Sequence, residues 1–69
     1  MQLSARNQLR GRVSAVRPGN VMAEVVVDIG GGKSLTSAIT RASAEALKLT
    51  VGDEVTAIIK STEVMIGKE

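Results

Sequence analysis

The sequence of 69 residues contains no aromatic residue, no cysteine and no histidine. A chain of this length is expected to form one domain, residues 1–69, which as a monomer buries only about 60% of the surface of its unfolded chain. Small domains usually gain stability from disulfides, a structural metal, oligomerisation or bulky aromatic residues. The missing residue types exclude a disulfide framework and an ordinary zinc site. Self-association is therefore the expected source of additional stability.

The same absences limit the chemistry that the chain can perform. Without His, Cys or Tyr, the candidates for a general acid, base or nucleophile are scattered carboxylates, lysines and hydroxyls without telling spacing. We therefore expect a binding protein and not an enzyme. No apolar run approaches the roughly 18 residues of a membrane span, and the first residues show no signal-peptide pattern. A cytoplasmic protein without a membrane partner is the default expectation.

Positive charge is concentrated at the start of the chain. Nine Lys and Arg against seven Asp and Glu give a net charge of +2, which is too small to indicate a polyanionic partner. The first 20 residues, however, contain no acid and four arginines, Arg6, Arg10, Arg12 and Arg17. This distribution is typical of a solvated basic strand, or of a site that attracts an anion.

Alternation of apolar and polar residues predicts the first three strands. Residues 7–17 and 21–29 have the period of half-buried strands and are separated by turn residues at 18–20. Gly30-Gly31-Gly32-Lys33 is typical of a hairpin turn, which leads into a third strand at 35–39. One face of the first strand is predicted to consist of Leu9, Gly11, Val13 and Ala15.

From Thr40 onward the residues favour a helix. The segment RASAEALKL follows a hydroxyl residue and predicts one short helix at about 41–48. After a turn at 51–53, alternation predicts a fourth strand at 55–60 and a fifth at 63–66. Five strands with one helix between the third and fourth predict a mainly β, OB-like small barrel. A small open sheet covered by a partner subunit would show the same pattern.

Nucleic-acid binding is the first function to consider for an OB-like barrel. Such surfaces stack bases on aromatic residues and follow the backbone with basic residues. This chain has basic residues on its first strand but no aromatic residue. A nucleic-acid-binding or regulatory module is therefore the alternative, and nucleic acid is an unlikely partner. A small anion needs only hydrogen-bond donors.

Three short segments offer such donors. Residues 4–8 have a hydroxyl and a guanidinium two positions apart, and a guanidinium matches a tetrahedral oxyanion well. Residues 40–43 would present the free N–H groups and the positive dipole end of the helix. Residues 60–61 combine a cation with a hydroxyl where the fourth strand ends. Taken singly, each has an ordinary explanation, such as a helix cap, a solvated strand end or a flexible terminus.

Taken together, the three segments resemble the molbindin (Mop) family of molybdate-binding modules, also called the TOBE domain. SARNQLRG at 4–11 is the most specific match, followed by SAIT at 37–40 and IIKSTEVMI at 58–66. The resemblance covers essentially the whole chain. It implies an OB-like barrel that binds molybdate or tungstate at subunit interfaces, for intracellular molybdenum storage and homeostasis. It also implies a homohexamer built as a trimer of dimers, without a covalent cofactor.

The resemblance further implies which residues bind the oxyanion. These are Ser4, Ala5 and Arg6 from one subunit and Thr40, Ser43, Lys60 and Ser61 from its neighbour. Molybdate is a dianion at neutral pH and only accepts hydrogen bonds, and segments 4–8, 40–43 and 60–61 contain donors but no acid. Phosphate keeps a proton near this pH, which needs an acceptor, and an unpaired group costs about 1–3 kcal/mol. Metal is expected only within the intact oxyanion, without metal ligands from the chain.

Overall fold

A computed structural model describes residues 2–69, in which three strands precede one α-helix and a fourth strand follows it. The elements are β1 (Asn7–Pro18), β2 (Met22–Gly30), β3 (Lys33–Thr40), α1 (Arg41–Ala46), β4 (Glu54–Ile59) and a 3₁₀ helix η1 (Ser61–Glu63). The order of the first four strands, with the helix between the third and fourth, is as predicted. The fold is mainly β, which confirms the predicted class.

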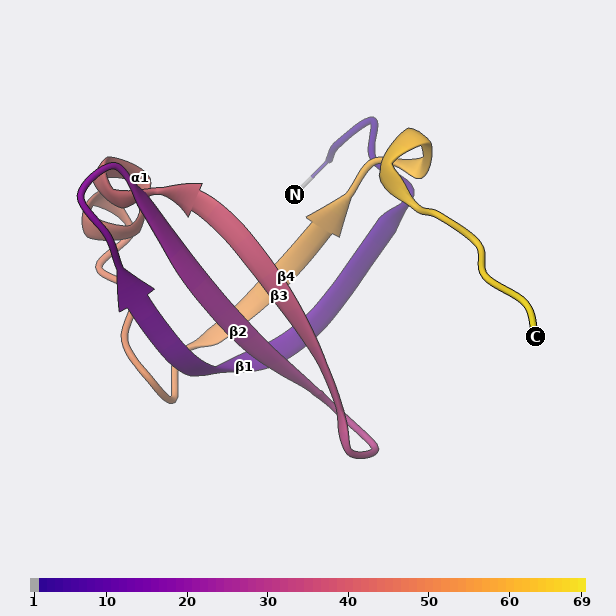
Figure 1. The fold of residues 1–69 in the computed structure, drawn as a ribbon, viewed down its shortest axis with the longest axis horizontal. Helices are drawn as coiled ribbons and strands as arrows, with labels where there is room; N and C mark the ends of the chain where they lie inside the picture. The colour runs from indigo at the N-terminus through magenta and orange to yellow at the C-terminus, as the bar shows by residue number, and fades with distance from the viewer. Residues whose placement is uncertain (1) are drawn as a thin grey trace.

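The strands form one antiparallel sheet in the order β3-β2-β1-β4. The sheet is strongly curled, so that the edge strands β3 and β4 lie across one groove from each other (Figure 1). The two edges are not hydrogen-bonded to each other. The structure is therefore a half-barrel that is open along one side.

Strand β1 organises the curled sheet because it pairs with a different strand along each half of its length. Its first half pairs with β4, from Asn7 to Arg12, and its second half pairs with β2, from Arg12 to Pro18. Gly11 lies at the changeover. A Cβ atom at this position would be 2.4 Å from the backbone oxygen of Asp28, closer than real atoms approach. The missing side chain thus lets β1 bend against β2.

A β-bulge in β1 changes which residues reach the core. Val13 pairs with Val27, but the next pair joins Ala15 to Val26, so one extra residue lies in β1. Such an insertion shifts the alternation of the side chains that follow. Beyond the bulge, Val16 packs against the core. The predicted position of Ala15 on the same face as Val13 was therefore wrong, because period-two alternation does not continue through a bulge.

The core of the domain is small. Its centre consists of Val13, Val25 and Val27, and partly buried side chains pack around it. In residues 2–69 the buried apolar residues are Ala5, Val13, Ala23, Val25, Val27 and Ala44. No buried side chain among these is larger than valine. The thin core expected from composition is therefore present in the structure.

Helix α1 is capped at both ends. At its start, the Thr40 hydroxyl accepts a hydrogen bond from the Ser43 N–H at 3.0 Å, as expected of a hydroxyl N-cap. At its end, Lys48 has a φ of 52° and the Leu49 N–H donates to the Ala44 carbonyl at 3.2 Å. This Schellman closure ends the helix at Ala46, before the predicted end at 48. No helix in the described part of the chain is long and apolar enough to cross a membrane.

The predicted fifth strand at 63–66 was wrong. After β4 the chain forms η1, in which the Glu63 N–H donates to the Lys60 carbonyl at 2.9 Å. This turn directs the following residues away from both sheet edges, and Figure 1 shows the C-terminal segment leaving the body of the domain. Met65 and Ile66 are 91% and 90% exposed. The apolar pattern at 63–66 is real, but within one chain it has no strand to pair with.

The contact at Gly11 yields the first prediction. Gly11→Ala is expected to lower the free energy of unfolding by about 1–3 kcal/mol, because the methyl group forces β1 and β2 apart. Urea unfolding at one fixed protein concentration measures the change. Gly67→Ala is the matched control, since a Cβ there meets no atom within 4 Å, and a change below about 0.5 kcal/mol is expected. Equal stability of the two variants would contradict the close approach.

The end of α1 yields the second prediction. Lys48→Gly is expected to raise the free energy of unfolding by about 0.5–1 kcal/mol, because glycine adopts a positive φ without steric cost. Thermal and urea unfolding both measure it. Lys48→Ala removes the same charge but keeps the Cβ atom, so it should give no such gain. A gain of the same size in both variants would show that the charge, and not the backbone conformation, limits stability.

Candidate functional site

Two of the three predicted segments lie together at one end of the sheet. Asn7 pairs with Ile59, which joins the first residue of β1 to the last residue of β4. Arg6 and Lys60 therefore leave the sheet at the same end and from adjacent strands. Figure 1 shows the start of β1 beside the end of β4 and η1. Segments 4–6 and 60–61 thus form a common surface within one chain.

Residues 4–6 are held by a buried alanine between two exposed side chains. Ala5 is 8% exposed, whereas Ser4 and Arg6 are exposed. The alanine side chain packs into the domain, and the hydroxyl and guanidinium on either side reach solvent. Ala5 itself has only a backbone N–H to offer a ligand. Lys60 and Ser61 are also exposed, so this end of the sheet presents two cations and two hydroxyls to solvent.

Most of the basic character of β1 is neutralised by acids from other strands. Arg10 and Arg12 both pair with Glu54, at 3.2 and 3.1 Å. Arg17 pairs with Glu24 at 2.6 Å. Within residues 2–69, neither Arg6 nor Lys60 has a carboxylate partner within 4 Å. Of the four arginines near the start of the chain, Arg6 is thus the one available to bind an anion.

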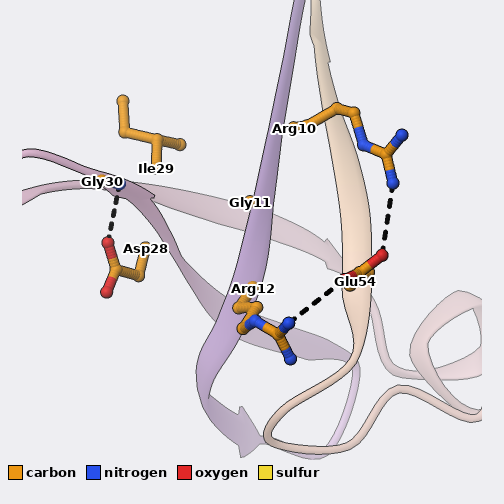
Figure 2. A pocket seen from close by; sticks show the side chains of 7 residues that line it. All are labelled: Arg10, Gly11, Arg12, Asp28, Ile29, Gly30 and Glu54. Atoms are coloured by element: carbon orange, nitrogen blue, oxygen red, sulfur yellow. Dashed lines mark hydrogen bonds and ion pairs between the residues drawn. The ribbon is translucent and has the colours of Figure 1, made fainter.

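Arg10 and Arg12 also line a surface pocket of about 500 Å³. In Figure 2, Glu54 lies between the two guanidinium groups, while the Asp28 carboxylate accepts a hydrogen bond from the Gly30 N–H at 2.8 Å. The polar groups of this pocket therefore bind one another, and the two carboxylates would repel an oxyanion. None of the predicted site residues lines it. Across residues 2–69, no three His, Cys, Asp or Glu side chains are grouped to hold a metal ion.

The remaining predicted residues, Thr40 and Ser43, lie at the opposite end of β1. Thr40 pairs with Met22, next to the residue that pairs with Pro18 at the end of β1. In Figure 1, α1 is accordingly far from the start of β1. The Thr40 hydroxyl contacts the Ser43 hydroxyl at 2.7 Å and acts as the helix cap. One chain therefore assembles segments 4–6 and 60–61 but not residues 40 and 43.

An apolar groove follows the open side of the half-barrel. It has a volume of about 350 Å³ and lies between the two edge strands. Its apolar lining includes Leu35 and Ile39 of β3 and Val55 and Ile59 of β4. A groove of this kind exposes apolar side chains beside unpaired strand edges, which is a common feature of interfaces between chains.

Asn7 was not among the predicted site residues. Its side-chain Nδ2 donates a hydrogen bond to the Ile59 carbonyl at 3.3 Å, and the contact is partly buried. The contact depends on the register of β1 against β4, which joins residues 52 positions apart. Alternation within one segment does not reveal such a register, so the sequence offered no signal for it.

Comparison with known protein families gives a match along most of the chain. The family model described as TOBE domain matches residues 3–66. The chain belongs to the TOBE domain family. This confirms the family predicted from the three motifs.

Relatives of this TOBE domain are similar along nearly its whole length. Molybdenum-pterin-binding protein 3 of Clostridium pasteurianum is 56% identical over 66 residues, which cover 96% of this chain and 97% of the relative. A molybdate-binding protein from Sporomusa ovata has the same fold, with a TM-score of 0.92 at 43% identity and coverage of 99% and 100%. The cytoplasmic molybdate-binding protein ModG, solved with molybdate bound, has a TM-score of 0.89 at 38% identity. That match covers 94% of this chain and 46% of the ModG chain.

Proposed function

We propose that residues 1–69 act as one module that binds molybdate or tungstate as the intact oxyanion, without a covalent cofactor. Its role would be molybdenum storage and homeostasis in the cytoplasm, and it would not be an enzyme. One structural observation carries the proposal: Arg6 and Lys60 lie at the same end of the sheet, without carboxylate partners in the described chain. Support also comes from the relatives, which are named for binding molybdenum-pterin or molybdate.

The proposed site consists of groups that donate hydrogen bonds. Guanidinium and ammonium groups are donors without acceptor capacity, and a serine hydroxyl can also donate. Hydrogen bonds between ionised partners are roughly twice as strong as neutral ones. A fully deprotonated dianion satisfies such a set, whereas a protonated phosphate leaves its own O–H without an acceptor. Sulfate has the charge of molybdate, so discrimination against it would rest on its shorter bonds.

The separation of the predicted residues favours a site shared between copies of the chain. If all seven residues bind one oxyanion, Thr40 and Ser43 must come from a different copy than Arg6, because they lie at opposite ends of β1. The division proposed from the resemblance also assigns Lys60 and Ser61 to the second copy. In one chain, however, these two residues lie beside segment 4–6. An interface at which the Arg6 and Lys60 end of one copy meets the Thr40 and Ser43 end of another would bring all seven residues together.

The apolar surface of the chain supports the proposed self-association. The groove between β3 and β4 is open, and the tail carries the exposed Met65 and Ile66. Covering such surfaces with a second copy would compensate for a core in which no described buried side chain exceeds valine. The assembly that we propose is a homohexamer built as a trimer of dimers. The mass of the protein in solution tests this number directly.

No structural observation favours the nucleic-acid alternative. Its basis was the basic first strand, and three of the four arginines there are paired with Glu54 or Glu24. A single-strand binder also stacks bases on aromatic side chains, and the chain has none. At the end of the sheet where β1 begins and β4 ends, Arg6 and Lys60 are two cations without an ion pair in the described chain, a small cluster that suits a small anion better than an extended one.

The third prediction tests the proposed ligand. Calorimetry with the folded oligomer is expected to show binding of molybdate and of tungstate at micromolar concentrations, with sulfate and phosphate as matched controls that bind far more weakly. Binding should also raise the melting temperature, because a ligand at 100 times its Kd stabilises the folded state by about 2.7 kcal/mol. Absence of heat and of stabilisation with both molybdate and tungstate would refute the proposed function.

The fourth prediction tests the assignment of Arg6. Arg6→Ala is expected to weaken molybdate binding by about 1.5–3 kcal/mol, the range for hydrogen bonds to charged groups. Arg10→Ala is the matched control, because it removes the same side chain from a position where it is paired with Glu54. Calorimetry should give Arg10→Ala an affinity close to that of the original protein. Equal losses in both variants would show a general electrostatic effect and remove Arg6 from the site.

A further inference from the structure

The two segments that carry Arg6 and Lys60 leave the sheet from the last rung of the ladder between β1 and β4. Asn7 and Ile59 are the last paired residues of β1 and β4 at this end. Beyond them, residues 2–6 and 60–69 have no backbone hydrogen bond to each other in the described structure. The bonds of η1 run only within residues 60–64. The Asn7–Ile59 rung is therefore the backbone pairing nearest to both cations, and it sets where their segments leave the sheet.

The Asn7 side chain strengthens that rung. Its Nδ2 donates to the Ile59 carbonyl at 3.3 Å in a partly buried position. A carbonyl oxygen only accepts hydrogen bonds, so the amide must present its NH₂ group here. The side chain thus joins the residue after Arg6 to the residue before Lys60.

We infer that Asn7 is a positioning residue for the oxyanion site, which fixes the spacing between Arg6 and Lys60 without itself binding the ligand. This inference rests on the proposed function. A guanidinium and an ammonium group that bind one small anion require a defined separation. If the backbone segments that carry them move relative to each other, the affinity of the site for the anion falls. Ala5 anchors the same segment through its burial, so the amide contact supplies the second point of attachment, on the side of β4.

The experiment is a double-mutant cycle measured by calorimetry with sodium molybdate. Asn7→Ala is expected to weaken binding about three- to tenfold, as for the loss of one neutral hydrogen bond. If Asn7 acts through Lys60, the same change made in a Lys60→Ala background should weaken binding less than about twofold. Asn7→Gln keeps an amide donor and should recover part of the affinity. Gln8→Ala is the matched control, because Gln8 is exposed and makes no side-chain hydrogen bond within the described residues.

The outcomes separate this inference from the proposed function. If the original protein binds molybdate and Asn7→Ala binds equally well, the positioning role is refuted and the proposed function stands. An Asn7→Ala loss of the same size in both backgrounds also refutes it, because the effect would then be independent of Lys60. If the original protein does not bind molybdate, the proposed function fails. A loss confined to the background with Lys60, at an unchanged oligomer mass, supports the role of Asn7.

Discussion

The bend of β1 at Gly11 is the constraint on which the rest of the structure depends. One strand pairs with β4 along its first half and with β2 along its second. A Cβ atom at Gly11 would collide with the backbone of β2. Without this bend the sheet would be flatter, and the valines of β1 and β2 would not enclose a core. The same pairing sets the end of β4 beside the start of β1, which brings Lys60 to the same end as Arg6.

The small core and the unpaired edge strands both leave apolar surface of this short chain exposed. A chain without aromatic residues fills a small curled sheet with valine and alanine, and the edge strands β3 and β4 of this sheet are not paired with each other. Closing the barrel needs another strand, and the pattern at 63–66 has the composition of one. In this chain that segment is directed away by η1. The apolar groove and the exposed tail are therefore surfaces whose burial would have to come from contact between chains.

Local patterns predicted the elements of this fold better than the contacts between them. The first four predicted strands and the Thr40 cap depend on neighbours in sequence, and each of these elements is present in the structure. Three features depend instead on residues far away in sequence: the bulge at Ser14, the register of Asn7 against Ile59, and the absence of a strand at 63–66. The three motifs predicted the candidate residues. Alternation did not show that Lys60 lies at the same end as Arg6 within one chain, because this depends on the register between β1 and β4. Nor did it show that Glu54 and Glu24 form ion pairs with the other three arginines.

In the proposed assembly, charge couples the ligand to the oligomer. Each chain carries a net charge of +2, so every added copy increases the repulsion that opposes association. Arg10, Arg12 and Arg17 contribute less to it than three free cations would, because two acids, Glu54 and Glu24, lie beside them. Arg6 and Lys60 have no such partner in the described chain, and they lie at the same end of the sheet. A dianion bound between this end and Thr40 and Ser43 of another copy would lower the net charge of the assembly, so ligand and assembly would stabilise each other by linkage.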